Sequence, residues 1–350
     1  MTHFPLRLRI DGEALVGNWR WLAAKSAGAA CGAAVKANGY GIGAVETVKR
    51  LADAGCRDFF VATWAEAEAL MPWPQGLALS VLHGVGPDDM PGALASPAKP
   101  VLNTSAQAAR WLESGGGLCD LMVDTGMNRL GMTASEAGAA IDAGLCVETL
   151  MSHLACADEP DHAMNVRQLQ EFDGICRSVK AKRYSLANSA GICLGKAYAF
   201  DLTRPGLALY GGVPVPADAE QAATISAVAV IEAQLVQVRD VSAGESVGYG
   251  ATFVASSPRT VGILNIGYAD GYLRSLGLGG SVRLGGRAFP VIGRVSMDLI
   301  TVDLSESGQA IDEGTWFQVD FDLPDAAARS GLSQYELLTT LGHRYERLWS

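Results

Sequence analysis

A lysine ends a short apolar run close to the amino terminus, in the stretch AAVKANGYGIG of residues 33–43. Three glycines, an asparagine and a tyrosine follow Lys36 within seven residues. Such a lysine is either a boundary residue whose stem packs while its ammonium reaches solvent, or an amine held in a pocket for Schiff-base chemistry. The other polar residues of the chain must decide between these two interpretations.

Further polar residues stand at or beside the ends of apolar runs: Asp124 in VDTGMNRLG, His153 in SHLACADE, Asn188 and Ser189 in ANSAG, and Arg204 in RPGLALYG. The elements that must position them are eight runs predicted as strands: 31–36, 59–64, 79–84, 100–103, 118–124, 147–153, 183–188 and 206–211. Helical segments such as 44–55 and 64–71 separate these runs. This alternation predicts an α/β fold, a (β/α)8 TIM-like barrel over residues 10–222, although the fourth run is weak.

In such a barrel the functional groups lie at the carboxyl ends of the strands, so the polar residues above fall at one rim. This common location favours the catalytic interpretation of Lys36. The ANSAG turn could open a helix whose free N–H groups, with the Ser189 hydroxyl, hold a phosphate, and the RPG turn stands where barrels often bind phosphate. A lysine able to form a Schiff base beside a phosphate site indicates pyridoxal 5'-phosphate. The chain has no GxxxxGK[ST] motif that would indicate a nucleotide instead.

The pattern changes after residue 222 to β-rich segments punctuated by glycine: AVIEAQLVQVRDV, TVGILNIGY, SVRLGGRAFPVIG and WFQVDF. Little helix is expected there before SQYELLTTLG near the carboxyl terminus. These segments predict a separate, mostly-β domain over residues 223–350. The opening segment 1–9 carries the alternating stretch LRLRI and is expected to add a strand to that domain.

Composition limits the classes of partner. The chain has 350 residues, 49% of them hydrophobic, which is ample for two domains with large cores. Its net charge of -10 and the absence of a basic block argue against nucleic acid or an anionic membrane and favour a small substrate. Seven scattered cysteines without metal-ligand spacing indicate reduced thiols and no metal site. No apolar stretch approaches the ~20 residues that span a bilayer, so a soluble cytoplasmic protein is expected.

Nine motifs taken together give a specific resemblance. They are, in order, AAVKANGYGIG, VDTGMNRLG, SHLACADE, ANSAG, RPGLALYG, VGYGATF, IGYADGY, GRVSMD and QYELLT. This series, from about residue 8 to the carboxyl terminus, resembles the bacterial alanine racemases, which are fold-type III pyridoxal-phosphate enzymes with a barrel and a carboxyl-terminal β domain. The resemblance implies interconversion of L-alanine and D-alanine by a two-base mechanism, either to supply D-alanine for peptidoglycan or to degrade alanine.

The resemblance assigns the two bases and their support. Lys36 would bind the cofactor covalently and, once displaced by substrate, act as base for the D-enantiomer, while Tyr249 would act on the L-enantiomer from the opposite face. Because a free tyrosine has a pKa of about 10, it needs help near neutrality. His153 and Arg204 match residues that form a hydrogen-bonded chain to that tyrosine. Arg204 also matches the residue at the pyridine nitrogen, where a guanidinium donates a hydrogen bond without giving up a proton and so discourages transamination.

The remaining matched positions bind cofactor or substrate. Those aligned with phosphate contacts are Tyr40, Ser189, Gly206, Leu207 and Tyr335, although ordinary helix packing would also explain Tyr335. Those aligned with substrate contacts are Arg129, through its guanidinium, Met297, through its backbone N–H, and Tyr268, which narrows the pocket. In the family, Tyr249, Tyr268 and Met297 reach the cofactor of the partner subunit, so a homodimer with composite active sites is implied.

Two positions depart from the family pattern. Many members carry a carbamylated lysine seven residues before the arginine that matches Arg129, and here that position is Met122. We therefore expect Arg129 to be held by another acidic side chain or by a bound anion, and we expect activity that does not depend on bicarbonate. The second departure is Ser185, where a histidine is more usual.

Three other functions remain open at this point. A fold-type III decarboxylase, or a racemase with broader substrates, is the nearest alternative, although Arg204 at the pyridine nitrogen argues against a decarboxylase. A non-catalytic pyridoxal-phosphate carrier on the same barrel would lack the β domain that supplies Tyr249. A Schiff-base aldolase without cofactor would show no visible absorption band from the lysine-bound cofactor.

Overall fold

The computed structural model describes residues 4–215 and 218–350. Its contacts divide the chain into two compact units, one of residues 14–226 and one that combines the segment up to Glu13 with Ala227–Ser350. We call them the barrel unit and the β unit. The first three residues of the segment 1–9, and residues 216–217 of the predicted barrel range, lie outside the described residues.

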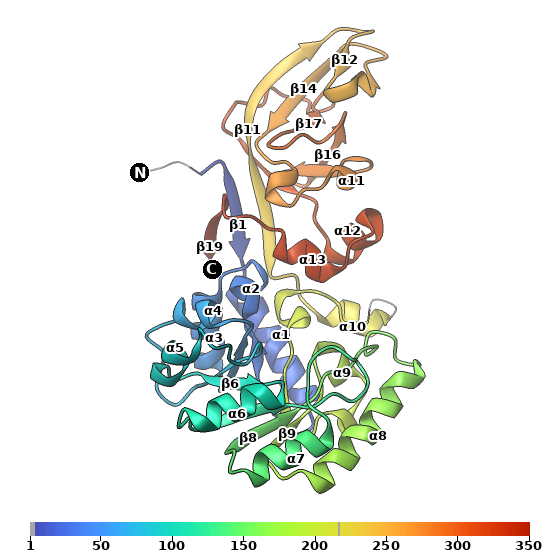
Figure 1. Cartoon of the computed structure of the whole chain (residues 1–350). Coiled ribbons are helices and arrows are strands. Elements are labelled where there is room, and N and C mark those ends of the chain that lie inside the picture. Colours follow the sequence, from blue (N-terminus) through green and yellow to red (C-terminus); the bar gives the residue numbers. More distant parts are fainter. Residues whose placement is uncertain (1–3, 216–217) are drawn as a thin grey trace. The chain divides into compact units, whose positions relative to one another are not determined.

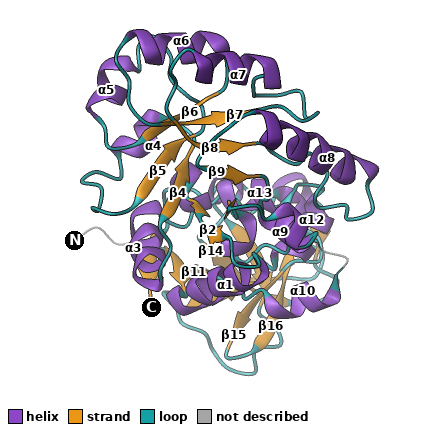
Figure 2. Ribbon diagram, turned by 90° about the horizontal axis from the view of Figure 1, so that it is seen from below, coloured by secondary structure: helices purple, strands orange, loops and turns teal. Residues whose placement is uncertain are grey.

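The barrel unit alternates strands and helices, with helices α5 to α8 on the outside of the strands (Figures 1 and 2). Its strands are β2 Ala30–Cys31, β3 Ala33–Ala34, β4 Asp58–Val61, β5 Ala78–Val81, β6 Lys99–Leu102, β7 Cys119–Met122, β8 Val147–Met151, β9 Arg183–Ser185 and β10 Leu202–Thr203. Its α-helices are α1 Gly12–Lys25, α2 Lys36–Tyr40, α3 Ala44–Ala54, α4 Trp64–Glu68, α5 Met90–Ala95, α6 Ser105–Glu113, α7 Ala134–Asp142, α8 Ala163–Ser178, α9 Ser189–Cys193 and α10 Ala219–Thr224. Two 3-10 helices are η1 Lys196–Tyr198 and η2 Leu207–Tyr210.

Backbone hydrogen bonds connect the strands into the predicted barrel. Strands β3 to β9 form a parallel sheet in sequence order, and β10 pairs in parallel with β2. The Asp201 N–H donates to the Tyr184 oxygen at 3.0 Å, which connects β10 with β9, and the Ala34 N–H donates to the Pro205 oxygen at 2.8 Å, which connects it with β3. The (β/α)8 architecture expected from the sequence is thereby confirmed.

The eighth strand was predicted at the wrong place. The run 206–211 contains the 3-10 helix η2, and the last barrel strand is the preceding β10. All four residues of η2 are buried, and periodicity alone does not distinguish a short, wholly apolar strand from a buried helical turn. The glycines at both ends of the run are the signal that favours a turn.

Burial explains why the other strands were recognisable. All four residues of β4 and of β7 are buried, as expected of parallel strands covered on both faces. Helix α3 buries Ala44, Thr47, Val48 and Leu51, which share one face at the helical spacing. This regular pattern is what made the barrel predictable.

The β unit is a closed antiparallel barrel of six strands, with β1 and β19 added to its sheet and a separate pair, β12 and β13 (Figure 1). Its strands are β1 Leu6–Ile10, β11 Ala229–Val241, β12 Ser246–Val247, β13 Phe253–Val254, β14 Arg259–Leu264, β15 Ser281–Leu284, β16 Arg287–Ile292, β17 Ile300–Asp303, β18 Trp316–Val319 and β19 Glu346–Trp349. Its helices are η3 Tyr249–Ala251, η4 Tyr268–Asp270, α11 Arg274–Gly277, α12 Leu323–Ser330 and α13 Gln334–Thr339.

The long strand β11 closes this second barrel. It pairs with β18 and, after a register shift between Leu235 and Gln237, with β14, which completes a ring through β17, β16 and β15. The expected strand at LRLRI is confirmed as β1, which pairs with β11 and β19.

Two further findings concern the state of the cysteines and the character of the helices in the described residues. All seven cysteines are free thiols; three are buried, three are half-buried and one is exposed. In residues 4–215 and 218–350, no helix combines the length and apolar character needed to cross a bilayer.

Candidate active site

The lysine turn, residues 36–40, is a run of left-handed backbone directly after the first barrel strands. Its residues 37–40 have φ values of 51°, 52°, 61° and 53°. Only the glycine adopts this conformation freely, so the other three residues each cost about 1–2 kcal/mol. Asn38 offsets part of this cost, because its Oδ1 accepts the Ala44 N–H at 3.0 Å and its backbone oxygen accepts the Gly43 N–H at 2.9 Å. The turn carries Lys36 at its start and Tyr40 at its end.

Four basic side chains act on one another electrostatically at the carboxyl-end rim of the barrel: Lys36, Arg129, His153 and Arg204. Burial lowers the pKa of Lys36, and the charge of Arg129 lowers it further, while Glu66 opposes both. Burial also lowers the pKa of His153 to about 3, with smaller contributions from the positive charges of the other three residues. His153 is therefore a neutral imidazole near pH 7, and the rim has an excess of positive charge that suits an anionic ligand.

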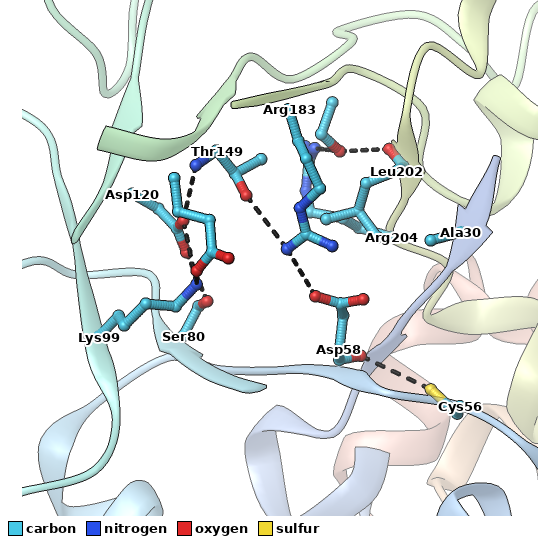
Figure 3. A network of polar contacts seen from close by, with 12 residues as sticks. Ala30, Cys56, Asp58, Ser80, Lys99, Asp120, Thr149, Arg183, Leu202 and Arg204 are labelled. Carbon is cyan, nitrogen blue, oxygen red and sulfur yellow. Dashed lines mark hydrogen bonds and ion pairs between the residues drawn. The ribbon is translucent and has the colours of Figure 1, made fainter. Parts of the chain in front are cut away.

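Arg204 is buried directly after β10, and two hydrogen bonds fix its guanidinium. One Nη1–H donates to Ser185 Oγ, and one Nη2–H donates to the Ser152 backbone oxygen at 2.5 Å. The Ser185 hydroxyl in turn donates to the Leu202 oxygen (Figure 3). Burial lowers the pKa of Arg204 to about 10, against the opposing charge of Asp120, so the guanidinium is protonated at neutral pH. Ser185 thus accepts a hydrogen bond from Arg204 and donates one to the backbone.

A second polar network joins side chains from the amino-terminal halves of the barrel strands (Figure 3). The buried Asp120 carboxylate accepts the Thr149 N–H at 3.0 Å and lies 3.4 Å from Lys99 Nζ. Arg183 donates to Asp58 Oδ1 at 2.7 Å. Paired charges at this end of a barrel serve stability, whereas the carboxyl-end rim serves function.

Ser189, Gly206 and Tyr40 form a cluster that fits a phosphate group. Ser189 Oγ is buried and accepts the N–H groups of Gly206 at 2.9 Å and Ala208 at 3.3 Å. Both bonds use the oxygen, so the hydroxyl proton can be donated to a ligand oxygen. A Cβ on Gly206 would lie 2.2 Å from Tyr40 Oη, so the glycine makes room for that hydroxyl. Leu207 follows as the first residue of η2.

Arg129 lies exposed in a loop that Asp124 shapes. The Asp124 carboxylate accepts the N–H groups of Gly126, Met127 and Asn128 at 2.9–3.1 Å, which explains its place after β7 without a catalytic role. Across the part of the chain that the structure describes, no acidic side chain forms an ion pair with Arg129, so the expected acidic partner is not found. The bound anion stays a prediction.

The β unit contains the other four predicted site residues, Tyr249, Tyr268, Met297 and Tyr335. Tyr249 in η3 is 69% exposed, and Met297 is 53% exposed. The Tyr268 N–H donates to the Ser296 oxygen at 3.1 Å, and the next N–H in the chain donates to the Met297 oxygen at 3.0 Å. The loops of Tyr268 and Met297 therefore lie side by side. Tyr335 lies half-exposed on α13.

Arg344 clamps these two loops of the β unit together. Its Nε and Nη2 donate to both oxygens of the buried Asp270, at 2.6 and 2.8 Å, and its Nη1 donates to Asp298 at 2.7 Å. Asp270 ends the 3-10 helix that contains Tyr268, and Asp298 follows Met297. No local sequence pattern predicts this cluster, because its three members are far apart along the chain.

Sequence reasoning also missed Glu66, which was seen only as part of a helical segment. Its carboxylate contacts the lysine turn through the Ala37 N–H at 2.7 Å. The available signal was the pattern Thr63-x-x-Glu66 directly after an apolar run, which is a capping box.

The fold and the site define a class of protein: a (β/α)8 barrel enzyme with a lysine of lowered pKa at a positively charged rim, and a β-barrel unit following it in the chain. The family descriptions "Alanine racemase, N-terminal domain" and "Alanine racemase, C-terminal domain" match residues 10–214 and 228–349. The chain belongs to the alanine racemase family.

Individual relatives agree with this assignment over the full length. The chain is 41% identical to an alanine racemase of Methylobacterium nodulans, over 97% of this chain and 95% of the relative. It is 43% identical to an alanine racemase of Dinoroseobacter shibae, over 97% of both chains. A crystal structure of alanine racemase from Bartonella henselae, with covalently bound pyridoxal phosphate, has a TM-score of 0.90 and 33% identity and covers 100% of both chains.

Proposed function

We propose that this protein is a pyridoxal-phosphate-dependent racemase that interconverts L-alanine and D-alanine. The observation that carries the proposal is the carboxyl-end rim of the barrel, where Lys36 has a lowered pKa beside Arg129, His153 and Arg204. A lowered pKa increases the neutral fraction of an amine, which can then form a covalent bond with a carbonyl or take up a proton. The Bartonella henselae relative with covalently bound pyridoxal phosphate supports the same cofactor here.

Pyridoxal phosphate, when bound, supplies an electron sink that makes the α-proton of an amino acid acidic. Lys36 would hold it covalently, and the protonated Arg204 would donate a hydrogen bond to its ring nitrogen without releasing a proton. The residues proposed for its phosphate are Tyr40, Ser189, Gly206, Leu207 and Tyr335. The buried Ser189 hydroxyl, with its proton available, supports this part of the proposal most directly.

Two bases serve the two faces of the substrate. Lys36 would move a proton at the alanine Cα on one face, and the Tyr249 hydroxyl would do so on the other. Because His153 is neutral near pH 7, its imidazole has one nitrogen that accepts a hydrogen bond and one that donates, as a hydrogen-bonded chain between Arg204 and Tyr249 would require.

Substrate selection rests on three further residues. Arg129, exposed and without an acidic partner in the described chain, is available to a carboxylate. The Met297 N–H would hold the same carboxylate, and Tyr268 would restrict the pocket to small side chains. Tyr249, Tyr268 and Met297 would come from the partner subunit, so the active unit would be a homodimer acting on a small amino acid in the cytoplasm.

Chiral chromatography of L-alanine incubated with the purified protein and pyridoxal phosphate tests the proposal. We expect conversion to equal amounts of both enantiomers, and the Lys36→Ala variant should lose both the visible absorption of the bound cofactor and the conversion. A Tyr249→Phe variant should keep the absorption and lose most of the conversion.

Other outcomes would identify the competing functions. A yellow wild-type protein that leaves L-alanine unchanged would be a cofactor carrier. Release of carbon dioxide from an amino acid without racemisation would indicate a decarboxylase. Either result would overturn the proposal.

A further inference from the structure

The strained lysine turn needs an anchor that the chemistry proposed above does not supply. Three residues of the turn other than glycine have left-handed φ angles, and the turn determines where Lys36 and Tyr40 lie. Such strain persists only where surrounding contacts hold the backbone in place. The N–H of Ala37, where the left-handed run begins, donates its hydrogen bond to a side chain of another element, namely Glu66 in α4.

Glu66 connects the loops that follow two neighbouring barrel strands. Its Oε1 accepts the Ala37 N–H, after β3, at 2.7 Å, and its Oε2 accepts the Ala62 N–H, after β4, also at 2.7 Å. Strands β3 and β4 are paired in the sheet. One rigid carboxylate therefore fixes the spacing between the lysine turn and the start of α4.

A second capping box shows that this arrangement is more than helix capping. In α7, Glu136 accepts the N-cap N–H of Thr133 at 2.8 Å, whereas Glu66 lies 3.4 Å from the equivalent N–H of Thr63. The short bonds of Glu66 go to Ala37 and Ala62 instead. Glu66 thus keeps a longer bond within its own capping box, while its shortest bonds hold the lysine turn and the residue after β4.

The charge of Glu66 acts in the same region. It is the group that raises the pKa of Lys36 against burial and Arg129. A carboxylate here therefore both orders the backbone of the turn and partly balances the positive rim.

We propose that Glu66 is the positioning residue of the lysine turn, and that it sets the location of Lys36 and Tyr40 without taking part in proton transfer. The inference rests on the proposed function for its consequences in cofactor binding, but its structural part does not. A matched pair of variants tests it: Glu66→Gln replaces one acceptor by a donor that faces an N–H, and Glu136→Gln makes the same change in the capping box of α7.

Hydrogen–deuterium exchange of the full chain without cofactor is the first readout. We expect the amides of residues 37–43 to exchange about tenfold or more faster in Glu66→Gln, because a charge-assisted hydrogen bond is lost. In Glu136→Gln, the same amides should exchange as in wild type. A Glu66→Asp variant keeps the charge but is one methylene shorter, so it should also speed the exchange of Ala37. Unchanged exchange of Ala37 in both Glu66 variants would overturn the proposal.

Cofactor titration is the second readout. We expect the Kd for pyridoxal phosphate to rise about tenfold in Glu66→Gln and to stay unchanged in Glu136→Gln. Equal Kd values for both variants would refute the role of Glu66 while leaving the racemase proposal intact. A wild-type protein that binds no pyridoxal phosphate would refute the proposed function, while the exchange experiment would still decide the role of Glu66 in the turn.

Discussion

A Gly206→Ala substitution tests the proposed phosphate site by adding a single methyl group. The new Cβ would lie 2.2 Å from Tyr40 Oη and 2.8 Å from its Cζ, far inside van der Waals contact. Gly206 has a negative φ of -132°, so the left-handed region that favours glycine plays no part, and the close contact of the new methyl group with Tyr40 is the main expected effect. The Tyr40 ring is 5% exposed and stacks on Tyr210 with a centroid distance of 4.8 Å, so it cannot yield without disturbing the core.

Two magnitudes follow from this geometry. Overpacking should lower the free energy of unfolding by about 1–3 kcal/mol. Displacement of the Tyr40 hydroxyl should remove a hydrogen bond to a charged phosphate, worth about 1.5–3 kcal/mol, and so raise the Kd for pyridoxal phosphate about 10- to 100-fold. Fluorescence titration of the cofactor and urea unfolding of the cofactor-free protein measure these two effects separately.

A matched glycine provides the control. A Cβ at Gly138, in helix α7 of the same unit, would meet no atom within 4 Å. The Gly138→Ala variant should leave the Kd unchanged and raise the free energy of unfolding by about 0.5–1 kcal/mol. If Gly206→Ala bound the cofactor as tightly as Gly138→Ala, Tyr40 would have no part in phosphate binding.

Three further predictions concern pH, the β unit and bicarbonate. Burial lowers the pKa of His153 to about 3 from an ordinary 6.5. Between these two values the unfolded chain binds a proton that the folded chain does not, so the free energy of unfolding is full above pH 6.5 and falls as the pH is lowered toward 3. The urea midpoint of a His153→Gln variant should therefore depend less on pH over this range. Arg344→Ala should lower the free energy of unfolding by about 1–3 kcal/mol, because the buried Asp270 loses its bidentate partner. The control Arg283→Ala breaks a more exposed ion pair and should lower it by at most about 1 kcal/mol. Equal losses of the two variants in urea unfolding would contradict the clamp. Bicarbonate should not increase racemase activity, because Met122 carries no amine that could form a carbamate, and strong activation in a kinetic assay would refute this.

The sequence predicted the elements whose pattern is local. The helix that begins in ANSAG is present as α9, and Asn188 caps it by accepting the Gly191 N–H at 2.8 Å. Strand β11 covers the whole of AVIEAQLVQVRDV. In these cases the capping residue or the alternation of buried positions lies within the segment itself. The strand predicted at 206–211 failed because an apolar run of that length has no periodicity to interpret.

The sequence could not predict contacts that depend on long-range geometry. Only the glycines of the segment indicated the left-handed turn after Lys36, since alanine and tyrosine rarely adopt the positive φ that Ala37 and Tyr40 have. The bond from Glu66 to Ala37 needs two loops that become neighbours only when their strands pair. The hydrogen bond that Arg204 donates to Ser185 likewise forms only when the barrel is closed.

The origin of the α-hydrogen in the product tests the central claim most directly, namely that Lys36 and Tyr249 serve opposite faces of the substrate. L-alanine is converted in D2O, and D-alanine is isolated at low conversion for mass spectrometry. Because one base removes the α-proton and the other, exchanged with solvent, delivers its replacement, the account predicts deuterium at Cα in nearly all of the first D-alanine formed. D-alanine that keeps the original α-proton would mean that a single base transfers it between the faces, and would contradict the account.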